Sequence, residues 1–319
     1  MSDRDTRGPA RGDPLSASSN GSGTQSPTEL SNPRTTDIDQ LGTLELLHRL
    51  NAEDASVPTA VERALPEVAR AVELAVHSLG SGGRVHYVGA GTSGRIAALD
   101  AAELPPTYNV PPEWFVVHLA GGQPAASGAV ENAEDDDSAG AAAVREAAES
   151  TDLVLGLAAS GRTPYVLGAL RAARELGAGT VLVSANPYRA EGPPVDVEVV
   201  VETGPEPITG STRMKAGTAQ KLVLNSFSTA VMVRLGRTYS NLMVDMVATN
   251  TKLRERTVRI LREATGASES ECLAALRTTR GQLKTALVHL LGGVDAARAA
   301  EALARTHGHV RDALRVLES

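Results

Sequence analysis

The chain has 319 residues, a net charge of -7 at pH 7 and one cysteine, Cys272. The negative charge argues against a nucleic-acid partner, and no apolar run reaches the roughly 18 to 20 residues of a membrane-spanning helix. A single cysteine excludes an intramolecular disulfide, and no secretory leader is evident, so we expect a soluble, cytoplasmic protein without a membrane partner.

Residues 1–36 are predicted to form a disordered tail. They are rich in Ser, Gly, Pro, Thr, Asp and Arg, and they hold too few large apolar side chains to offset the entropy lost on ordering. Helical spacing begins at Ile38. A longer helix is predicted to open just before Pro58 and to end at the glycines of residues 80–83.

Short apolar, β-branched runs then alternate with helical segments. The predicted strands cover residues 84–89, 115–121, 152–160, 180–186 and 197–204. Their apolar character is continuous, which is typical of parallel strands covered on both faces. Residues 37–238 are therefore predicted to form a doubly wound α/β domain around a mainly parallel five-stranded sheet.

The end of the chain has a different character. A long helix is predicted from about Lys215 to Leu235, and residues 239–319 contain helical segments without a clear strand. We interpret residues 239–319 as a small all-helical subdomain.

The segment GAGTSG at residues 89–94 has the glycine spacing of a dinucleotide-binding turn. In that fold an acidic residue at the carboxyl end of the second strand holds the ribose. Glu113 has about the right spacing, but it precedes the second strand. The sequence therefore favours a different phosphate ligand over NAD.

Two loops combine small hydroxyl residues with the predicted start of a helix. Thr92 and Ser93 follow the first strand, and Ser160 and Thr163 follow the third. A helix N-terminus attracts anions, and these loops share the sheet edge where ligands bind. A small phosphorylated substrate fits this pattern, although each loop alone is equally well explained by helix caps and tight turns.

A third cluster lies in residues 207–225, where Ser211 and Thr212 precede the long helix. It is either a capped helix start or a set of hydroxyls that closes over a sugar or phosphate. Arg162 and Lys215 are possible charge partners for phosphate, and each is equally well explained as a surface cation. The histidines are scattered and predict no metal site.

Several long motifs occur in order between Gly89 and Arg256, within a match that runs from about Ile38 to the C-terminus: GAGTSGR, DAAELPPTY, ENAEDD, LAASGRTPYV, TGSTRMKAGTAQKLVLN and NLMVDMVATNTKLRER. Together they resemble the N-acetylmuramic acid 6-phosphate etherases of the sugar isomerase (SIS) superfamily. The glucokinase regulatory protein, a phosphosugar sensor without catalytic activity, is a relative, so the fold by itself does not separate enzyme from sensor. A sugar phosphate isomerase is a further alternative.

The resemblance implies cleavage of the D-lactyl ether at C3 of a phosphorylated amino sugar, by elimination and then addition of water. It implies a homodimer, and no redox cofactor or metal. Glu103 matches the family's proton donor, so we assign it to protonate the leaving oxygen. Glu134 matches the second active-site residue, as a base or to activate water. Phosphate contacts carry over to Ser93, Ser160 and Thr163, although Ala158 stands where related isomerase domains often have a hydroxyl.

The residues themselves support these two carboxylates less strongly. Glu103 stands near the end of a predicted helix, where glutamates are commonly solvated. Glu134 lies within an acidic run, which is usually a solvated face or a helix start. Pro105 and Pro106 are expected to stop the helix directly after Glu103.

Overall fold

The structure is a computed structural model that describes residues 26–188, 192–246 and 251–318. A central sheet has five strands: β1 (Val85–Gly89), β2 (Phe115–Leu119), β3 (Leu153–Leu157), β4 (Gly179–Ser184) and β5 (Val197–Val200). All neighbouring strands pair in parallel, in the order β2-β1-β3-β4-β5. The predicted fold class is confirmed, and the strand order reverses between β1 and β3.

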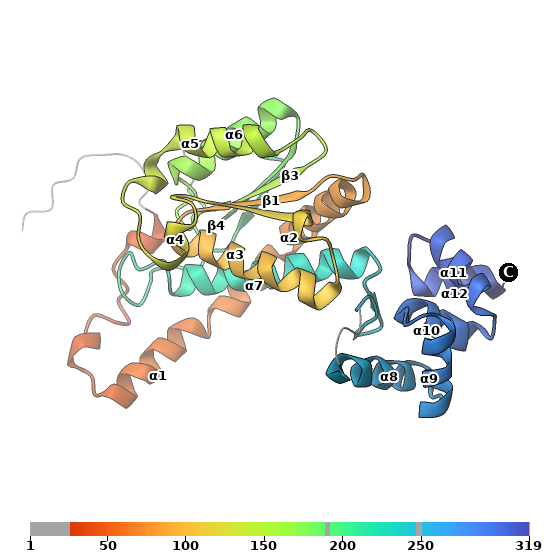
Figure 1. Ribbon diagram of the computed structural model, residues 1–319. Helices are drawn as coiled ribbons and strands as arrows, with labels where there is room; N and C mark the ends of the chain where they lie inside the picture. Colours follow the sequence, from red (N-terminus) through yellow and green to blue (C-terminus); the bar gives the residue numbers. More distant parts are fainter. Residues whose placement is uncertain (1–25, 189–191, 247–250, 319) are drawn as a thin grey trace, which may run out of the picture.

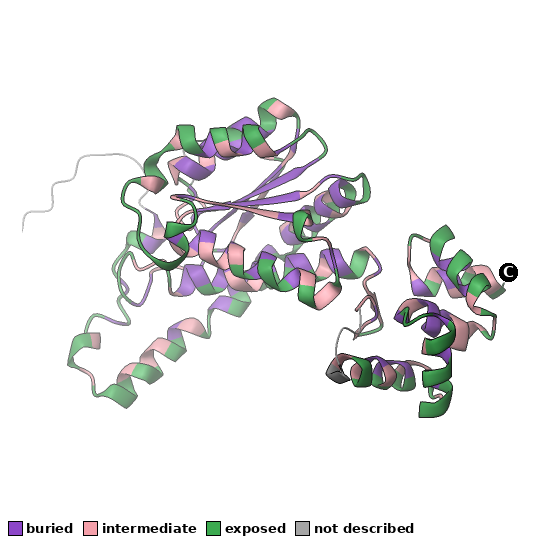
Figure 2. Ribbon diagram, viewed as in Figure 1, coloured by how far each residue is buried: buried purple, intermediate pink, exposed green. Residues whose placement is uncertain are grey.

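Helices cover both faces of this sheet (Figure 1). One face carries α2 (Val57–Gly80), α3 (Gly91–Tyr108) and α7 (Lys215–Arg234), and the other carries α5 (Asp137–Ala147) and α6 (Pro164–Leu176). The first core contains Tyr87, Leu155 and Phe227, whereas the second is rich in alanine. The inner strands β1 and β3 are buried throughout and β4 almost throughout, whereas the edge strand β2 is mostly half-buried (Figure 2). The inner strands are covered by helices on both faces.

Several strands end earlier than the sequence predicts. The strands expected over 115–121, 152–160 and 197–204 end at Leu119, Leu157 and Val200. The residues beyond them leave the ladder to form loops at the carboxyl edge of the sheet. Four short segments lie in or beside the connections: η2 (Ile38–Gln40), η3 (Pro112–Trp114), α4 (Pro124–Ser127) and η4 (Ala133–Asp135).

The prediction that helix α3 stops at the prolines is wrong. The helix includes Pro105 and Pro106 and continues to Tyr108, where Asn109 ends it with a left-handed φ of 52° and donates its N–H to the Pro105 carbonyl at 2.9 Å. Proline already has a helical φ, and its cost within a helix comes from the missing N–H donor and from contact of its ring with the carbonyl four residues earlier. Burial of Leu104 in the core holds this turn in place.

The predicted tail boundary at residue 36 is also wrong for residues 26–36, whereas residues 1–25 lie outside the described residues. The segment contains η1 (Pro27–Glu29), and the side chains of Thr28 and Asn32 are buried. The prediction of disorder rested on the small number of apolar residues, but this segment is ordered by hydrogen bonds from polar side chains. The Asn32 amide donates to the Pro205 carbonyl at 3.3 Å, and the Thr35 hydroxyl to the Pro207 carbonyl at 2.8 Å.

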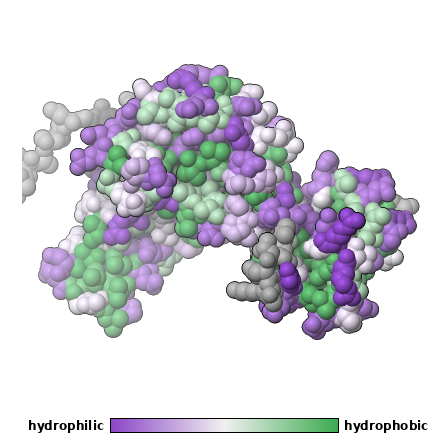
Figure 3. Space-filling model, in the orientation of Figure 1, coloured by the Kyte–Doolittle hydropathy of each residue, from purple (hydrophilic) through white to green (hydrophobic). Residues whose placement is uncertain are grey.

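Helix α1 (Thr43–Asp54) projects from the body of the molecule (Figure 1). Leu44 is 69% exposed and Leu47 is 56% exposed. These side chains contribute to a hydrophobic surface on the projecting helix (Figure 3). Their exposure leaves apolar side chains on the surface of this helix.

The C-terminal region is helical, as predicted, and has its own apolar core. Its helices are α8 (Thr251–Thr265), α9 (Glu269–Thr278), α10 (Leu283–Gly292), α11 (Ala296–Arg305) and α12 (Val310–Glu318). A two-stranded ribbon of β6 (Thr238–Tyr239) and β7 (Leu242–Met243) precedes them, which the sequence did not indicate. No helix within the described ranges is both long and apolar enough to cross a membrane.

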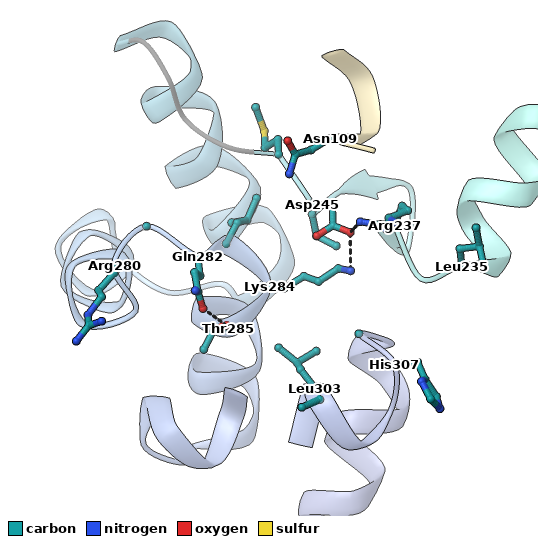
Figure 4. A pocket seen from close by; sticks show the side chains of 16 residues that line it. Asn109, Leu235, Arg237, Asp245, Arg280, Gln282, Lys284, Thr285, Leu303 and His307 are labelled. Atoms are coloured by element: carbon teal, nitrogen blue, oxygen red, sulfur yellow. Dashed lines mark hydrogen bonds and ion pairs between the residues drawn. The ribbon is translucent and has the colours of Figure 1, made fainter. Parts of the chain in front are cut away.

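An ion cluster ties this region to the sheet domain (Figure 4). Asp245 accepts from Arg237 and from Lys284, each at 2.7 Å, and the Arg237 guanidinium lies 4.9 Å from the ring centre of Trp114. A cavity of about 580 Å³ lies at this junction, beside Asn109 at the C-terminal end of α3.

Candidate active site

A cavity of about 310 Å³ at the carboxyl edge of the sheet collects four of the predicted site residues. It is lined by Glu134, Ser160, Thr163 and Thr212. They come from three separate loops, which the strand order brings together beside the point where it reverses. Open α/β sheets bind their ligands at such a point.

Glu134 also lines an adjacent cavity of about 250 Å³ beside the β1 loop. Gly91 and Arg95, at the start of α3, lie on its wall. Glu134 therefore belongs to both cavities, one at the N-terminal end of α3 and the other at the N-terminal end of α6.

The two helix starts at this edge differ in their backbone donors: α3 begins with Gly91 and Thr92, whereas α6 begins with Pro164, which has no N–H, and the Val166 N–H donates to the Thr163 carbonyl at 3.0 Å. Among the described residues, no side chain caps α3 at Ala90 or α6 at Thr163. The first N–H groups of a helix have no partner within it, and the helix dipole adds positive potential there. The dipole suits a phosphate group at either helix start, with backbone donors at α3 and the hydroxyls of Ser160 and Thr163 at α6.

The β3 loop is held by a buried amide that the sequence analysis missed. The Asn186 side chain is fully buried and donates to the Ser160 carbonyl at 3.0 Å. Its oxygen accepts the Tyr188 N–H at 3.0 Å, and Arg162 donates to the Tyr188 carbonyl at 2.9 Å. Arg162 lines the cavity from this anchored position.

Glu134 is placed by an arginine that the sequence analysis also missed. Arg95 donates to the Ala125 carbonyl at 3.0 Å and to the Gly128 carbonyl. Both carbonyls belong to the segment that leads to η4, which carries Glu134. Arg95 thus holds this segment to the first turns of α3.

The acidic run after Asn132 divides into residues with different roles. Asp136 caps α5 by accepting the Ala139 N–H at 2.8 Å, and Asp137 pairs with Arg171 at 2.9 Å. Glu134 and Asp135 remain to line the cavity. Spacing alone could not assign these roles.

Within the described residues, three other predicted hydroxyl residues line neither cavity: Thr92, Ser93 and Ser211. Ser93 is 9% exposed in the first turn of α3, and Thr92 faces Gly217 of α7. Ser211 is half-buried beside Thr212.

Glu103 lies well away from Glu134 in the chain's fold. Its side chain is exposed, and its position on α3 is about 18 Å from Gly91 along the helix axis. Leu99, one turn earlier on the same helix face, is 49% exposed. Glu103 lines neither of the two cavities at the described sheet edge.

Lys215 is neither a charge partner for phosphate nor a surface cation, so both predictions for it are wrong. Its side chain is fully buried, and its ammonium lies 3.1 Å from a carboxylate oxygen of Glu53. Hydrogen bonds from Arg34 and then Asn32 and Lys215 lower the pKa of Glu53 to about 2, against the opposing effect of burial. The ion pair with Glu53 anchors the end of the loop before α7, and Lys215 does not line the cavity.

Glu206 completes this support. Its carboxylate accepts the backbone N–H groups of Lys215 at 2.8 Å and Ala216 at 3.0 Å. A carboxylate at the start of α7 accepts hydrogen bonds from backbone N–H groups that have no partner within the helix, and its negative charge interacts favourably with the positive end of the helix dipole. Burial raises the pKa of Glu206.

The fold brings together two histidines that the sequence analysis treated as scattered. His86 Nδ1 lies 2.9 Å from His118 Nε2, and His86 Nε2 lies 3.0 Å from Asp152. Burial lowers the pKa of His118 to about 4, so the ring is neutral at pH 7. Asp152 also accepts the backbone N–H of Arg84 at 2.7 Å. Arg84 directly precedes β1 and Asp152 directly precedes β3, so this network lies toward the amino-terminal edge of the sheet, opposite the two cavities.

The chain is similar to known proteins over most of its length. A sequence profile of the glucokinase regulatory protein N-terminal SIS domain matches residues 67–174. The N-acetylmuramic acid 6-phosphate etherase of Thermobifida fusca is 59% identical over 267 residues, covering 84% of this chain and 88% of that protein. The etherase of Serratia proteamaculans is 50% identical over 288 residues, covering 90% of this chain and 97% of that protein.

Solved structures also resemble the chain. A phosphoheptose isomerase from Francisella tularensis aligns with a TM-score of 0.48 and 20% identity, over 60% of this chain and 98% of that one. The predicted resemblance is confirmed by the identity to the etherases, which extends over more than four fifths of this chain. The chain belongs to the N-acetylmuramic acid 6-phosphate etherase family.

Proposed function

We propose that this protein cleaves the D-lactyl ether of N-acetylmuramic acid 6-phosphate, giving N-acetylglucosamine 6-phosphate and D-lactate. Membership of the etherase family supports this activity. The observation that supports this activity at this site is that one cavity at the sheet edge is lined by Glu134, Ser160, Thr163 and Thr212.

The reaction needs one acid and one base. In the open-chain sugar, the C2 proton is alpha to the aldehyde, and a carboxylate removes it. The electron pair forms the C2–C3 double bond as the C3–O bond breaks, and an acid protonates the departing lactate oxygen. Water then adds at C3 and a proton returns to C2, so the process involves no net oxidation and requires no redox cofactor or metal.

Glu134 is the proposed base, which removes the C2 proton or activates the water. Ser160 and Thr163 hold the phosphate at the start of α6, and Thr212 closes the cavity from the loop before α7. Thr92, Ser93 and Ser211 are proposed as further contacts that form when substrate draws the loops together. Their positions beside the α3 and α7 starts support this role.

Glu103 is the proposed acid, and it would be supplied by a second copy of the chain. Its distance from the α3 start argues against action at its own chain's cavity, and exposed Leu99 beside it offers apolar surface for a partner. The projecting α1, with Leu44 and Leu47 exposed, supports a homodimer in the same way. The protein would work in the cytoplasm, in line with its single cysteine and its phosphorylated substrate.

The experiment that tests this function is an assay of D-lactate release from N-acetylmuramic acid 6-phosphate by the purified protein. We expect stoichiometric release of D-lactate and N-acetylglucosamine 6-phosphate. Binding of the substrate without release would instead identify a sensor, and formation of an isomeric sugar phosphate would identify an isomerase.

A further inference from the structure

The segment before α1 contributes an acidic side chain to the candidate active site. Glu29, in η1, lines the same cavity as Glu134 and Ser160. The motifs that carry the etherase resemblance begin later, at Gly89, and sequence analysis placed Glu29 in a disordered tail.

Hydrogen bonds fasten this segment to the loop that carries Thr212. The Gly210 N–H donates to the Thr28 carbonyl at 3.0 Å, one residue from Glu29. Thr28 is fully buried, and its hydroxyl lies 3.0 Å from that of Ser26. With the Asn32 and Thr35 contacts to the same loop, these bonds fix the backbone on both sides of Glu29.

The Glu29 carboxylate lies directly over Gly210. A Cβ atom at position 210 would stand 3.2 Å from Glu29 Oε2. Gly210 also has a φ of +74°, which favours glycine. The glycine thus gives the carboxylate room to lie against the loop backbone.

The charges around the cavity indicate which part of a phosphosugar the acid would meet. Glu29, Glu134 and Asp135 line it, together with Arg162, which is bonded to the Tyr188 carbonyl. Within the described ranges, Glu29 pairs with no cation. A carboxylate repels phosphate but accepts short, strong hydrogen bonds from hydroxyl groups.

From this geometry we infer that Glu29 is a substrate-positioning residue, whose carboxylate accepts hydrogen bonds from hydroxyl groups of the sugar while the α6 start holds the phosphate. The inference rests on the proposed phosphosugar function. It assigns to residues 26–36 the task of forming one wall of the site.

Binding measurements test this role separately from turnover. We expect calorimetry to show that Glu29→Ala weakens binding of N-acetylglucosamine 6-phosphate about 10- to 100-fold, the loss expected for a hydrogen bond to a charged group. Affinity for inorganic phosphate should not fall, because phosphate accepts no hydrogen bond from the Glu29 carboxylate and is repelled by it. A matched control is Glu62→Ala, which removes an exposed carboxylate of α2 and should alter neither affinity.

Turnover provides the second measurement. In the D-lactate assay, Glu29→Ala should raise KM more than it lowers kcat, with an unchanged thermal unfolding midpoint, and Glu29→Gln should have a smaller effect. Sugar phosphate affinity equal to that of the wild type, equal weakening toward inorganic phosphate, or no sugar phosphate binding by the wild type would each overturn the inference. Sugar phosphate binding that depends on Glu29, without D-lactate release by the wild type, would overturn only the etherase activity.

Discussion

The ammonium of Lys215 lies 3.1 Å from a carboxylate oxygen of Glu53, and the two side chains are 1% and 4% exposed. This ion pair joins the last turn of α1 to the first turn of α7. Because the loop with Ser211 and Thr212 ends at Lys215, the pair fixes one end of a predicted substrate-binding segment.

Replacing Glu53 by glutamine should destabilise the protein strongly. The Lys215 ammonium would stay buried without its carboxylate, which typically costs about 3–5 kcal/mol. Urea unfolding at pH 7 measures this loss. Glu67→Gln is the control, because Glu67 pairs with Arg70 at the surface of α2 and should contribute less than about 1 kcal/mol.

The effect of Glu53→Gln should also depend on pH. The pKa of Glu53 lies at about 2 in the folded protein, below its ordinary value of 4.5. Its carboxylate therefore stabilises the fold fully above pH 4.5, and this contribution disappears as the pH falls through about 2. The stability difference from the wild type should narrow between pH 4.5 and pH 2, and a constant difference would contradict the assignment.

Glu134→Gln should abolish most D-lactate release. We expect turnover to fall about 10²- to 10⁴-fold, the usual contribution of a general acid or base. Affinity for N-acetylglucosamine 6-phosphate should change little, because the cavity keeps its shape. Glu146→Gln, at an exposed position of α5, is the control and should retain full activity. Near-normal turnover of Glu134→Gln would remove this residue from the mechanism.

Mixing two inactive variants tests whether Glu103 acts across a dimer. If each site combines Glu103 of one copy with Glu134 of the other, a dimer of one Glu103→Gln and one Glu134→Gln chain has one intact site. Random exchange of subunits should then restore about a quarter of the wild-type activity. Sites built within a single chain predict no recovery, and a monomer in light scattering would exclude the shared site directly.

Arg95→Met should loosen the segment that carries Glu134. The two hydrogen bonds from Arg95 to backbone carbonyls would be lost, so the amides of residues 121–135 should exchange hydrogen faster. Turnover should fall about tenfold, the effect expected when a reacting group is slightly misplaced. Arg145→Met, which breaks an exposed pair with Glu175, is the control and should change neither measurement.

The order of elements was readable from the sequence because each strand is a short run of apolar, β-branched residues. Burial on both faces imposes that pattern without reference to distant residues. The glycine turn was readable as well, and its reason is close packing. A Cβ at Gly94 would stand 2.6 Å from the Gly89 carbonyl oxygen, so α3 can start directly against β1.

Errors arose where a distant contact overrides a local preference. Pro105 and Pro106 disfavour a helix locally, yet burial of Leu104 keeps α3 intact beyond them. Residues 26–36 look disordered, yet hydrogen bonds to residues 205–210 order them. Neither contact has a signal in the neighbouring sequence.

The sheet, the hydroxyl loops after its first and third strands, and the family were all predictable from the amino-acid sequence. These depend on local patterns and on motifs that are continuous in the chain. Three features required the folded structure: Glu134 lines the cavity while Asp136 and Asp137 bond to helices, Lys215 is buried, and Glu29 lines the site. The physical reason is that the direction and burial of a charged side chain depend on partners far away in the chain, which only folding brings within hydrogen-bond distance.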